Sequence, residues 1–156
     1  MAEVVDAAAV AAPVSPVIPR PRLSVAIIAR DEEANLLHTL PTLAFADEIV
    51  VVDSGSADAT VAVAEAHGAR VLRVAWQGFG RQKNVALEAT TGEWILSLDA
   101  DEAVPAALAA EIVAAIADPQ ADAYLIPRLN YFLGRPMRHG GLFPDRKLRL
   151  ARRGSG

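Results

Sequence analysis

The chain has 156 residues, of which 53% are hydrophobic, and this fits one domain with a substantial core. It contains no cysteine, which excludes a disulfide framework and a thiolate metal site and is compatible with a reducing cytoplasm. Residues 128–156 hold eight basic residues and one acid, for a net +7, whereas residues 1–127 hold seven basic and eighteen acidic residues, for −11. This asymmetry predicts either contact with an anionic partner or arginines paired with acids of the body.

Residues 1–22 are rich in Ala, Val and Pro, and we expect them to form a mostly disordered leader. The first residues are acidic where a secretory signal would be basic. No apolar stretch reaches the roughly 18 residues that a membrane-spanning helix needs.

From residue 23 onward, strand and helix signals alternate. The apolar, β-rich runs predict strands at 23–29, 48–52, 70–74 and 94–98, and the segments between them predict helices at 33–40, 57–67, 82–89 and 105–117. This alternation predicts an α/β fold with a mostly parallel sheet flanked by helices. Beyond residue 123 we expect a short, loop-rich antiparallel extension, with strands at 124–127 and 147–150, packed against one end of the sheet.

Two carboxylates, Asp99 and Asp101, follow the apolar run Trp-Ile-Leu-Ser-Leu. Residues two apart in an extended strand point the same way, so both carboxylates would face one spot beyond the strand. Two negative charges held together need a proton or a cation. A divalent metal that also binds a phosphate would meet that need.

Two other strand ends are also polar. The first strand ends in Ala29-Arg30-Asp31-Glu32-Glu33, and the second in Asp53-Ser54-Gly55-Ser56. Ligands of open α/β sheets bind outside the carboxyl ends of the strands, so three polar ends favour a site there. Asp31 and Ser56 are equally compatible with helix capping. Asp53 would either accept hydrogen bonds from a ribose hydroxyl or a base N–H, or cap its own turn.

Two further segments are candidates for ligand contact. Residues 78–84, Gly-Phe-Gly-Arg-Gln-Lys-Asn, place two glycines and two cations at a helix start, which predicts a weak phosphate cradle. They form neither a Walker loop nor a Rossmann fingerprint. His139, beside two glycines in the basic segment, is a candidate for substrate contact.

Four motifs in this order resemble a known family: Ile-Ile-Ala-Arg-Asp-Glu-Glu, Glu-Ile-Val-Val-Val-Asp-Ser-Gly-Ser, Gly-Phe-Gly-Arg-Gln-Lys-Asn and Leu-Ser-Leu-Asp-Ala-Asp-Glu. The chain resembles family 2 glycosyltransferases with the GT-A nucleotide-binding fold. A later stretch, Asn-Tyr-Phe-Leu-Gly-Arg and His-Gly-Gly with Lys-Leu-Arg-Leu, is similar to the lipopolysaccharide-core β-glucosyltransferase subgroup. The resemblance runs from residue 23 to about residue 153.

The resemblance implies a role for each matching residue. Ala29, Arg30 and Glu32 would line the nucleotide pocket, Asp53 would bind the uridine, and Lys83 would lie near the nucleotide or its diphosphate. Asp99 and Asp101 would form the Asp-x-Asp motif, with Asp99 facing the ribose and metal and Asp101 ligating the metal, Mg²⁺ or Mn²⁺. Arg30 and Asp31 stand where relatives often carry Lys-Asn.

The resemblance also implies the reaction and its partners. We expect inverting transfer of a sugar, glucose by the subgroup, from a UDP-sugar to a glycolipid or polysaccharide such as lipopolysaccharide core. No nucleic-acid partner is expected. The expected location is the cytoplasm, with peripheral association at the cytoplasmic face of the inner membrane. Candidates for contact with the acceptor or donor sugar are Arg128, His139 and Asp145.

The general base of relatives lies downstream of the Lys-Leu-Arg-Leu strand, so we expect this chain to be truncated and to lack the base. It would then bind a UDP-sugar with metal but transfer the sugar poorly. One alternative is a non-catalytic fragment that binds only a nucleotide sugar or a partner. A more remote alternative is a haloacid-dehalogenase-type phosphohydrolase. Ala103 argues against it, because Thr or Val usually stands at that position, and the motif lies on the fourth strand instead of the first.

Overall fold

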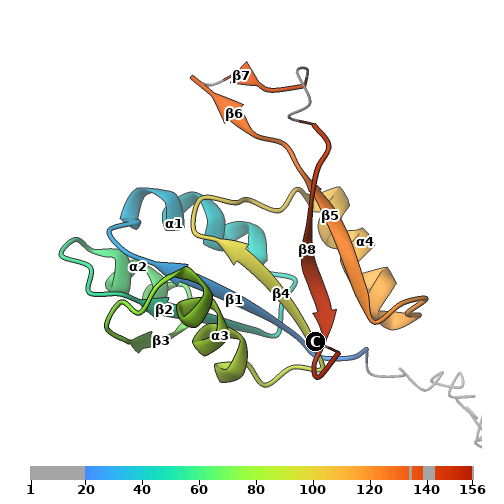
Figure 1. The fold of residues 1–156 in the computed structure, drawn as a ribbon, viewed down its shortest axis with the longest axis horizontal. Helices are drawn as coiled ribbons and strands as arrows, with labels where there is room; N and C mark the ends of the chain where they lie inside the picture. Colours follow the sequence, from blue (N-terminus) through green and yellow to red (C-terminus); the bar gives the residue numbers. More distant parts are fainter. Residues whose placement is uncertain (1–19, 134, 139–142, 156) are drawn as a thin grey trace, which may run out of the picture.

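The computed structural model describes residues 20–133, 135–138 and 143–155. Its main element is a six-stranded sheet with the strand order β3-β2-β1-β4-β8-β5 (Figure 1). The first four strands are parallel, and β8 is antiparallel to β4 and to the edge strand β5. The strands are β1 (Leu23–Ala29), β2 (Glu48–Asp53), β3 (Arg70–Arg73), β4 (Trp94–Asp99), β5 (Ala123–Arg128) and β8 (Asp145–Arg152).

Helices cover both faces of the parallel part of the sheet, which confirms the predicted fold class. The larger core cluster joins one face to α1 (Glu33–Thr39), α2 (Thr60–Ala66) and α4 (Ala106–Ala117), and a short 3₁₀ helix, Leu40–Leu43, follows α1. A smaller cluster joins the other face to α3 (Phe79–Ala89). Strands covered on both faces read as continuous Val/Ile/Leu runs, which is why the sequence located them closely.

Two helix starts differ from the prediction. Helix α2 begins at Thr60, three residues later than expected, because the preceding segment is bonded to the loop after β1. Asp31 Oδ1 accepts a hydrogen bond from Ala57 N at 2.7 Å, and Glu33 Oε2 accepts one from Ala59 N at 3.2 Å. Helix α3 begins at Phe79, three residues earlier than expected, directly after Gly78, whose φ of 96° makes the turn.

The C-terminal strands are more closely integrated than expected. Strand β8 pairs with β4 and so continues the main sheet sideways, because Leu150 is buried in the same core as Leu96. Between β5 and β8, the unpredicted strands β6 (Tyr131–Phe132) and β7 (Arg135–Pro136) form a small antiparallel sheet that projects from the body (Figure 1).

Strand β8 contains a bulge that matters for the site. Its register with β5 pairs Tyr124 with Leu150 and Leu125 with Leu148, so Arg149 is an extra residue. In a regular strand, Arg149 and Leu150 would point to opposite faces, but a bulge can re-aim one of them. Here both side chains are buried, and Arg149 reaches the carboxyl end of β4.

Candidate functional site

The carboxyl ends of β1, β2 and β4 meet at one edge of the sheet. Ala29 is paired in register with Asp53, and Ile28 with Asp99. The structure therefore places the three predicted polar strand ends next to one another.

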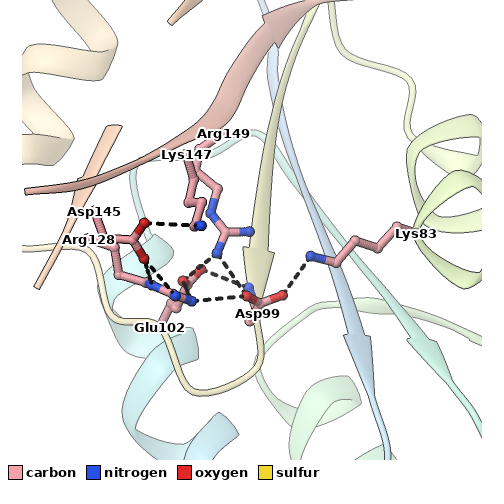
Figure 2. A network of polar contacts seen from close by, with 7 residues as sticks. All are labelled: Lys83, Asp99, Glu102, Arg128, Asp145, Lys147 and Arg149. Atoms are coloured by element: carbon pink, nitrogen blue, oxygen red, sulfur yellow. Dashed lines mark hydrogen bonds and ion pairs between the residues drawn. The ribbon is translucent and has the colours of Figure 1, made fainter. Parts of the chain in front are cut away.

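Asp99, the last residue of β4, is held by two cations from opposite sides (Figure 2). Lys83 Nζ on α3 lies 2.8 Å from Asp99 Oδ1, and Arg149 Nη2 on β8 lies 2.8 Å from Asp99 Oδ2. Burial favours a higher pKa for the Asp99 carboxyl, but the hydrogen bonds and charges of Lys83 and Arg149 outweigh it and lower the pKa below its usual value. Asp99 is thus an ionised carboxylate whose two oxygens are already bonded.

Glu102 extends this contact into a network of seven charged side chains (Figure 2). Glu102 Oε2 accepts the backbone N–H of Asp99 at 3.0 Å, while Oε1 accepts Arg149 Nη2 and lies 3.4 Å from Arg128 Nη1. Arg128 Nη2 continues to Asp145 Oδ2 at 2.8 Å, and Lys147 Nζ lies 3.0 Å from Asp145 Oδ1. Arg128 and Arg149 of the basic segment thus pair with acids of the body, as one of the two alternatives for the charge asymmetry states.

The network includes two of the residues predicted to contact the acceptor or donor sugar, Arg128 and Asp145. Burial favours a lower pKa for the Arg128 guanidinium, but Asp145 and Glu102 outweigh it and raise the pKa. The hydrogen bond from Lys147, and then that from Arg128, lower the pKa of the Asp145 carboxyl. Arg128 and Asp145 therefore bind each other at the edge of the site, and Arg128 Nη1 lies 3.9 Å from Asp99 Oδ2.

Asp101 is exposed and lines a pocket of about 610 Å³ together with Glu102, Arg128 and Arg149. Within residues 20–133, 135–138 and 143–155, no group of three or more His, Asp or Glu side chains is arranged to hold a metal ion. A metal at this edge would therefore need further ligands, such as substrate oxygens, in addition to one or two of these carboxylates.

Asp53 is buried and caps its own turn. Its carboxylate accepts the backbone N–H groups of Gly55 at 3.1 Å and Ser56 at 3.2 Å, and also the Ser56 hydroxyl. This is the capping alternative that the sequence left open. Asp53 also lines a second pocket, of about 490 Å³, whose wall includes Arg73 and the half-exposed Trp76.

Ala29, the last residue of β1, and the three residues after it have different surroundings. Arg30 is exposed and Ala29 is buried, while Glu32 accepts a hydrogen bond from Asn35 Nδ2 at 2.6 Å. Asp31, at a φ of 54°, instead ties the two loops together, since its N–H donates to Ser56 Oγ at 2.9 Å. His139 lies outside the residues that the structure describes.

Sequence reasoning missed three residues of this site: Gln82, Glu102 and Arg149. Gln82 is fully buried, and its Nε2 donates to Ser54 Oγ at 2.9 Å and to the Val74 carbonyl at 3.0 Å, which fixes α3 against the turn after β2. Glu102 directly follows Asp101 and could have been considered with it. Arg149 is the extra residue of the bulge in β8, and no local sequence pattern marks that bulge.

The model of the family described as glycosyl transferase family 2 matches residues 24–153. The chain belongs to this family. The matched range includes the carboxyl ends of β1, β2 and β4. It leaves the phosphohydrolase alternative without support.

Known proteins similar to this family 2 chain include a lipopolysaccharide core biosynthesis glycosyltransferase, LpsC, from Rhizobium meliloti. It is 35% identical over 147 residues, which cover 89% of this chain and 54% of LpsC. Thus the chain spans about half the length of this relative. In the described part of this family 2 chain, no helix is long and apolar enough to cross a membrane.

Two solved structures are similar to this family 2 chain in fold. Staphylococcus aureus TarS 1–349, in complex with UDP-GlcNAc, has a TM-score of 0.62 and 27% identity, over 76% of this chain and 37% of TarS. The mannosyltransferase PcManGT from Pyrobaculum calidifontis, in complex with GDP-Man and Mn²⁺, has a TM-score of 0.58 and 27% identity, over 71% and 37% of the two chains.

Proposed function

We propose that this chain is the donor-binding part of an inverting glycosyltransferase that uses a UDP-sugar, with glucose as the expected sugar. The observation that carries the proposal is the ionised Asp99 beside Lys83, at the edge where β1, β2 and β4 end. In a family 2 chain, a carboxylate and a cation at this edge suit a metal-bound sugar diphosphate. Ala29, Arg30, Glu32 and Asp53 would complete the nucleotide contacts.

The donor set fits Mg²⁺ or Mn²⁺. These ions prefer oxygen ligands and are often held by one or two carboxylates plus substrate phosphates, so the lack of a described three-residue cluster is compatible with the proposal. Asp101 and Asp99 would hold the ion. When bound, such an ion neutralises charge that develops on the leaving diphosphate. Manganese in the PcManGT complex supports this assignment.

The chain's own residues would bind and orient the donor. Lys83 can move its ammonium from Asp99 to a phosphate, because its side chain is one-third exposed. In the inverting reaction, the acceptor hydroxyl attacks the anomeric carbon as the bond to the diphosphate breaks, and the hydroxyl loses a proton to a general base. We assign no described side chain to that role. Asp145 is a poor candidate, since Arg128 and Lys147 already bind it.

The proposed acceptor is a glycolipid or polysaccharide such as lipopolysaccharide core, as the similarity to LpsC suggests. Peripheral binding to an anionic membrane on the cytoplasmic side is part of this proposal. The projecting β6–β7 sheet exposes Tyr131, Phe132 and Leu133, next to the exposed Arg135 and Arg138. Apolar side chains beside cations suit the interface of an anionic bilayer.

Co-sedimentation with vesicles tests the membrane part. The chain should sediment with vesicles that contain anionic lipid but not with neutral vesicles, and Leu133→Asp should weaken this binding. Leu125→Asp is the matched control, because Leu125 is also exposed but lies on β5 in the main sheet. Equal binding to both vesicle types, or equal effects of the two substitutions, would contradict the membrane contact.

A second candidate is a fragment that binds the nucleotide sugar without transferring it. The paired state of Asp145 favours it, because Arg128 and Lys147 already bind this carboxylate. A glucosyl-transfer assay on this chain and on a version extended to the length of relatives separates the two. Activity confined to the longer chain would favour the fragment.

Calorimetry with UDP and Mn²⁺ tests donor binding. The wild-type chain should release heat, and Asp101→Ala should abolish or strongly reduce it. No heat with the wild type, or unchanged heat with Asp101→Ala, would contradict the proposal. Thermal stabilisation by a panel of UDP- and GDP-sugars with Mn²⁺ then identifies the donor.

A further inference from the structure

Arg149 is the most buried cation of the network, with only 9% of its side chain exposed (Figure 2). Its Nη2 lies 2.8 Å from Asp99 Oδ2 and also donates to Glu102 Oε1. One nitrogen thus joins the last residue of β4 to the acid that accepts the Asp99 backbone N–H. Asp99 is therefore fixed at its main chain and at one side-chain oxygen by the same pair of residues.

The two oxygens of Asp99 have different surroundings. Oδ2 is bonded to the buried Arg149 from the same sheet, whereas Oδ1 is bonded to Lys83, whose side chain is one-third exposed on α3. An arginine bound by two carboxylates cannot leave without depriving both of a cation, and one of them, Glu102, is largely buried. A partly exposed lysine can exchange its partner at little cost. Incoming ligands would therefore displace Lys83 and leave Arg149 in place.

We propose that Arg149 is a positioning residue, which holds the Asp99 carboxylate in a fixed orientation so that Oδ1 is available to the metal and donor diphosphate. The inference rests on the proposed donor binding at Asp99. Arg149 touches neither the metal nor the donor in this role, and acts through Asp99 as an outer partner of a ligand. Substitution of such partners typically lowers metal affinity by about 10- to 100-fold.

The experiment separates this role from its opposite, competition of Arg149 with the metal, which predicts an effect of the opposite sign. A guanidinium so near the carboxylate repels a divalent ion by its charge, so Arg149 could compete with the metal. If Arg149 competes with the metal, its removal strengthens UDP binding in the presence of Mn²⁺. If Arg149 positions Asp99, its removal weakens UDP binding in the presence of Mn²⁺, because the Asp99 carboxylate loses its fixed geometry.

The experiment measures the Kd of UDP by calorimetry, once with EDTA and once with saturating Mn²⁺. The ratio compared between variants is the Kd with EDTA divided by the Kd with Mn²⁺, which states how strongly the metal tightens UDP binding. Arg149→Met should reduce this ratio by about 10- to 100-fold. Arg149→Lys, which keeps a charge but has a shorter reach, should give an intermediate ratio. Arg152→Met is the control, since Arg152 lies on the same strand and pairs with Asp122 at 3.3 Å, away from Asp99.

The ratio separates positioning from a general loss of structure, which would weaken UDP binding equally with and without metal. An unchanged or raised ratio in Arg149→Met overturns the inference while leaving donor binding intact. If Arg149→Met does not fold, Arg149→Lys decides, and a ratio equal to that of the wild type overturns the inference. Absence of UDP binding by the wild-type chain overturns the proposed function and this inference together.

Discussion

Lys83 Nζ and Asp99 Oδ1 lie 2.8 Å apart and join α3 to the end of β4. This contact connects two motifs that the sequence could only treat separately, a Gly-rich helix start and a pair of carboxylates. In this contact, the cation that would face a phosphate rests on the carboxylate that would face the metal.

Lys83→Met should therefore weaken UDP binding in the presence of Mn²⁺. A hydrogen bond between charged groups contributes about 1.5 to 3 kcal/mol, which corresponds to a roughly 10- to 100-fold rise in Kd. The free energy of unfolding should change by less than about 1 kcal/mol, because the ion pair is partly exposed. Calorimetry and chemical denaturation measure the two effects. A large loss of stability with unchanged Kd would assign Lys83 a structural role instead.

The sequence predicted the parallel strands well and the basic segment less well, for a physical reason. Strands β1 and β2 are buried on both faces, so apolar runs mark their bounds to within one residue. Strand β8 is exposed over much of its length and contains a bulge, so alternation of polarity neither marks its ends nor shows where Arg149 points. A side chain re-aimed by a bulge depends on pairing with distant β5, which no local pattern encodes.

The acid at the start of β2 makes stability depend on pH. Glu48 accepts hydrogen bonds from Ser24 Oγ at 2.5 Å, Thr91 N at 2.7 Å and Arg70 Nη2 at 3.1 Å. Burial favours a higher pKa for Glu48, but these bonds outweigh it and lower the pKa from 4.5 to about 2. A lowered pKa stabilises the fold above the unfolded value, and that contribution is lost as pH falls from 4.5 towards about 2.

Glu48→Gln should accordingly lower the free energy of unfolding by about 1 to 2 kcal/mol at pH 7. The difference from wild type should shrink as pH falls below 4.5, because the Glu48 carboxyl of the unfolded wild-type chain then binds a proton that the folded chain does not bind until about pH 2. Urea denaturation at pH 7 and pH 3 measures it. Glu65→Gln on the exposed side of α2 is the control and should change stability little at either pH. A constant difference at both pH values would contradict the assignment.

Replacement by alanine should have opposite effects on the stability of the fold at Gly92 and at Gly80. A Cβ at Gly92 would lie 2.8 Å from the Arg22 carbonyl oxygen and 2.9 Å from Ser24 N, so backbone atoms must shift. Gly92→Ala should destabilise the fold by about 1 to 3 kcal/mol. Gly80 lies within α3 with nothing within 4 Å, so Gly80→Ala should stabilise it by about 0.5 to 1 kcal/mol. Thermal denaturation measures the stability change of each variant. A change of the same sign in Gly92→Ala and Gly80→Ala would contradict the close packing at Gly92.

Asp53 offers the last test, because it caps a turn and is also predicted to contact the uridine. Asp53→Asn keeps one acceptor oxygen but places an NH₂ group near the N–H groups of Gly55 and Ser56. Stability should fall by about 1 kcal/mol or more from this mismatch. If Asp53 also contacts the uridine, the Kd of UDP should rise roughly tenfold, as one lost hydrogen bond implies, while the Kd of pyrophosphate stays unchanged. Calorimetry with UDP and with pyrophosphate, each in the presence of Mn²⁺, measures the two Kd values. An equal rise in both would mean that Asp53 caps its turn without contacting the uridine.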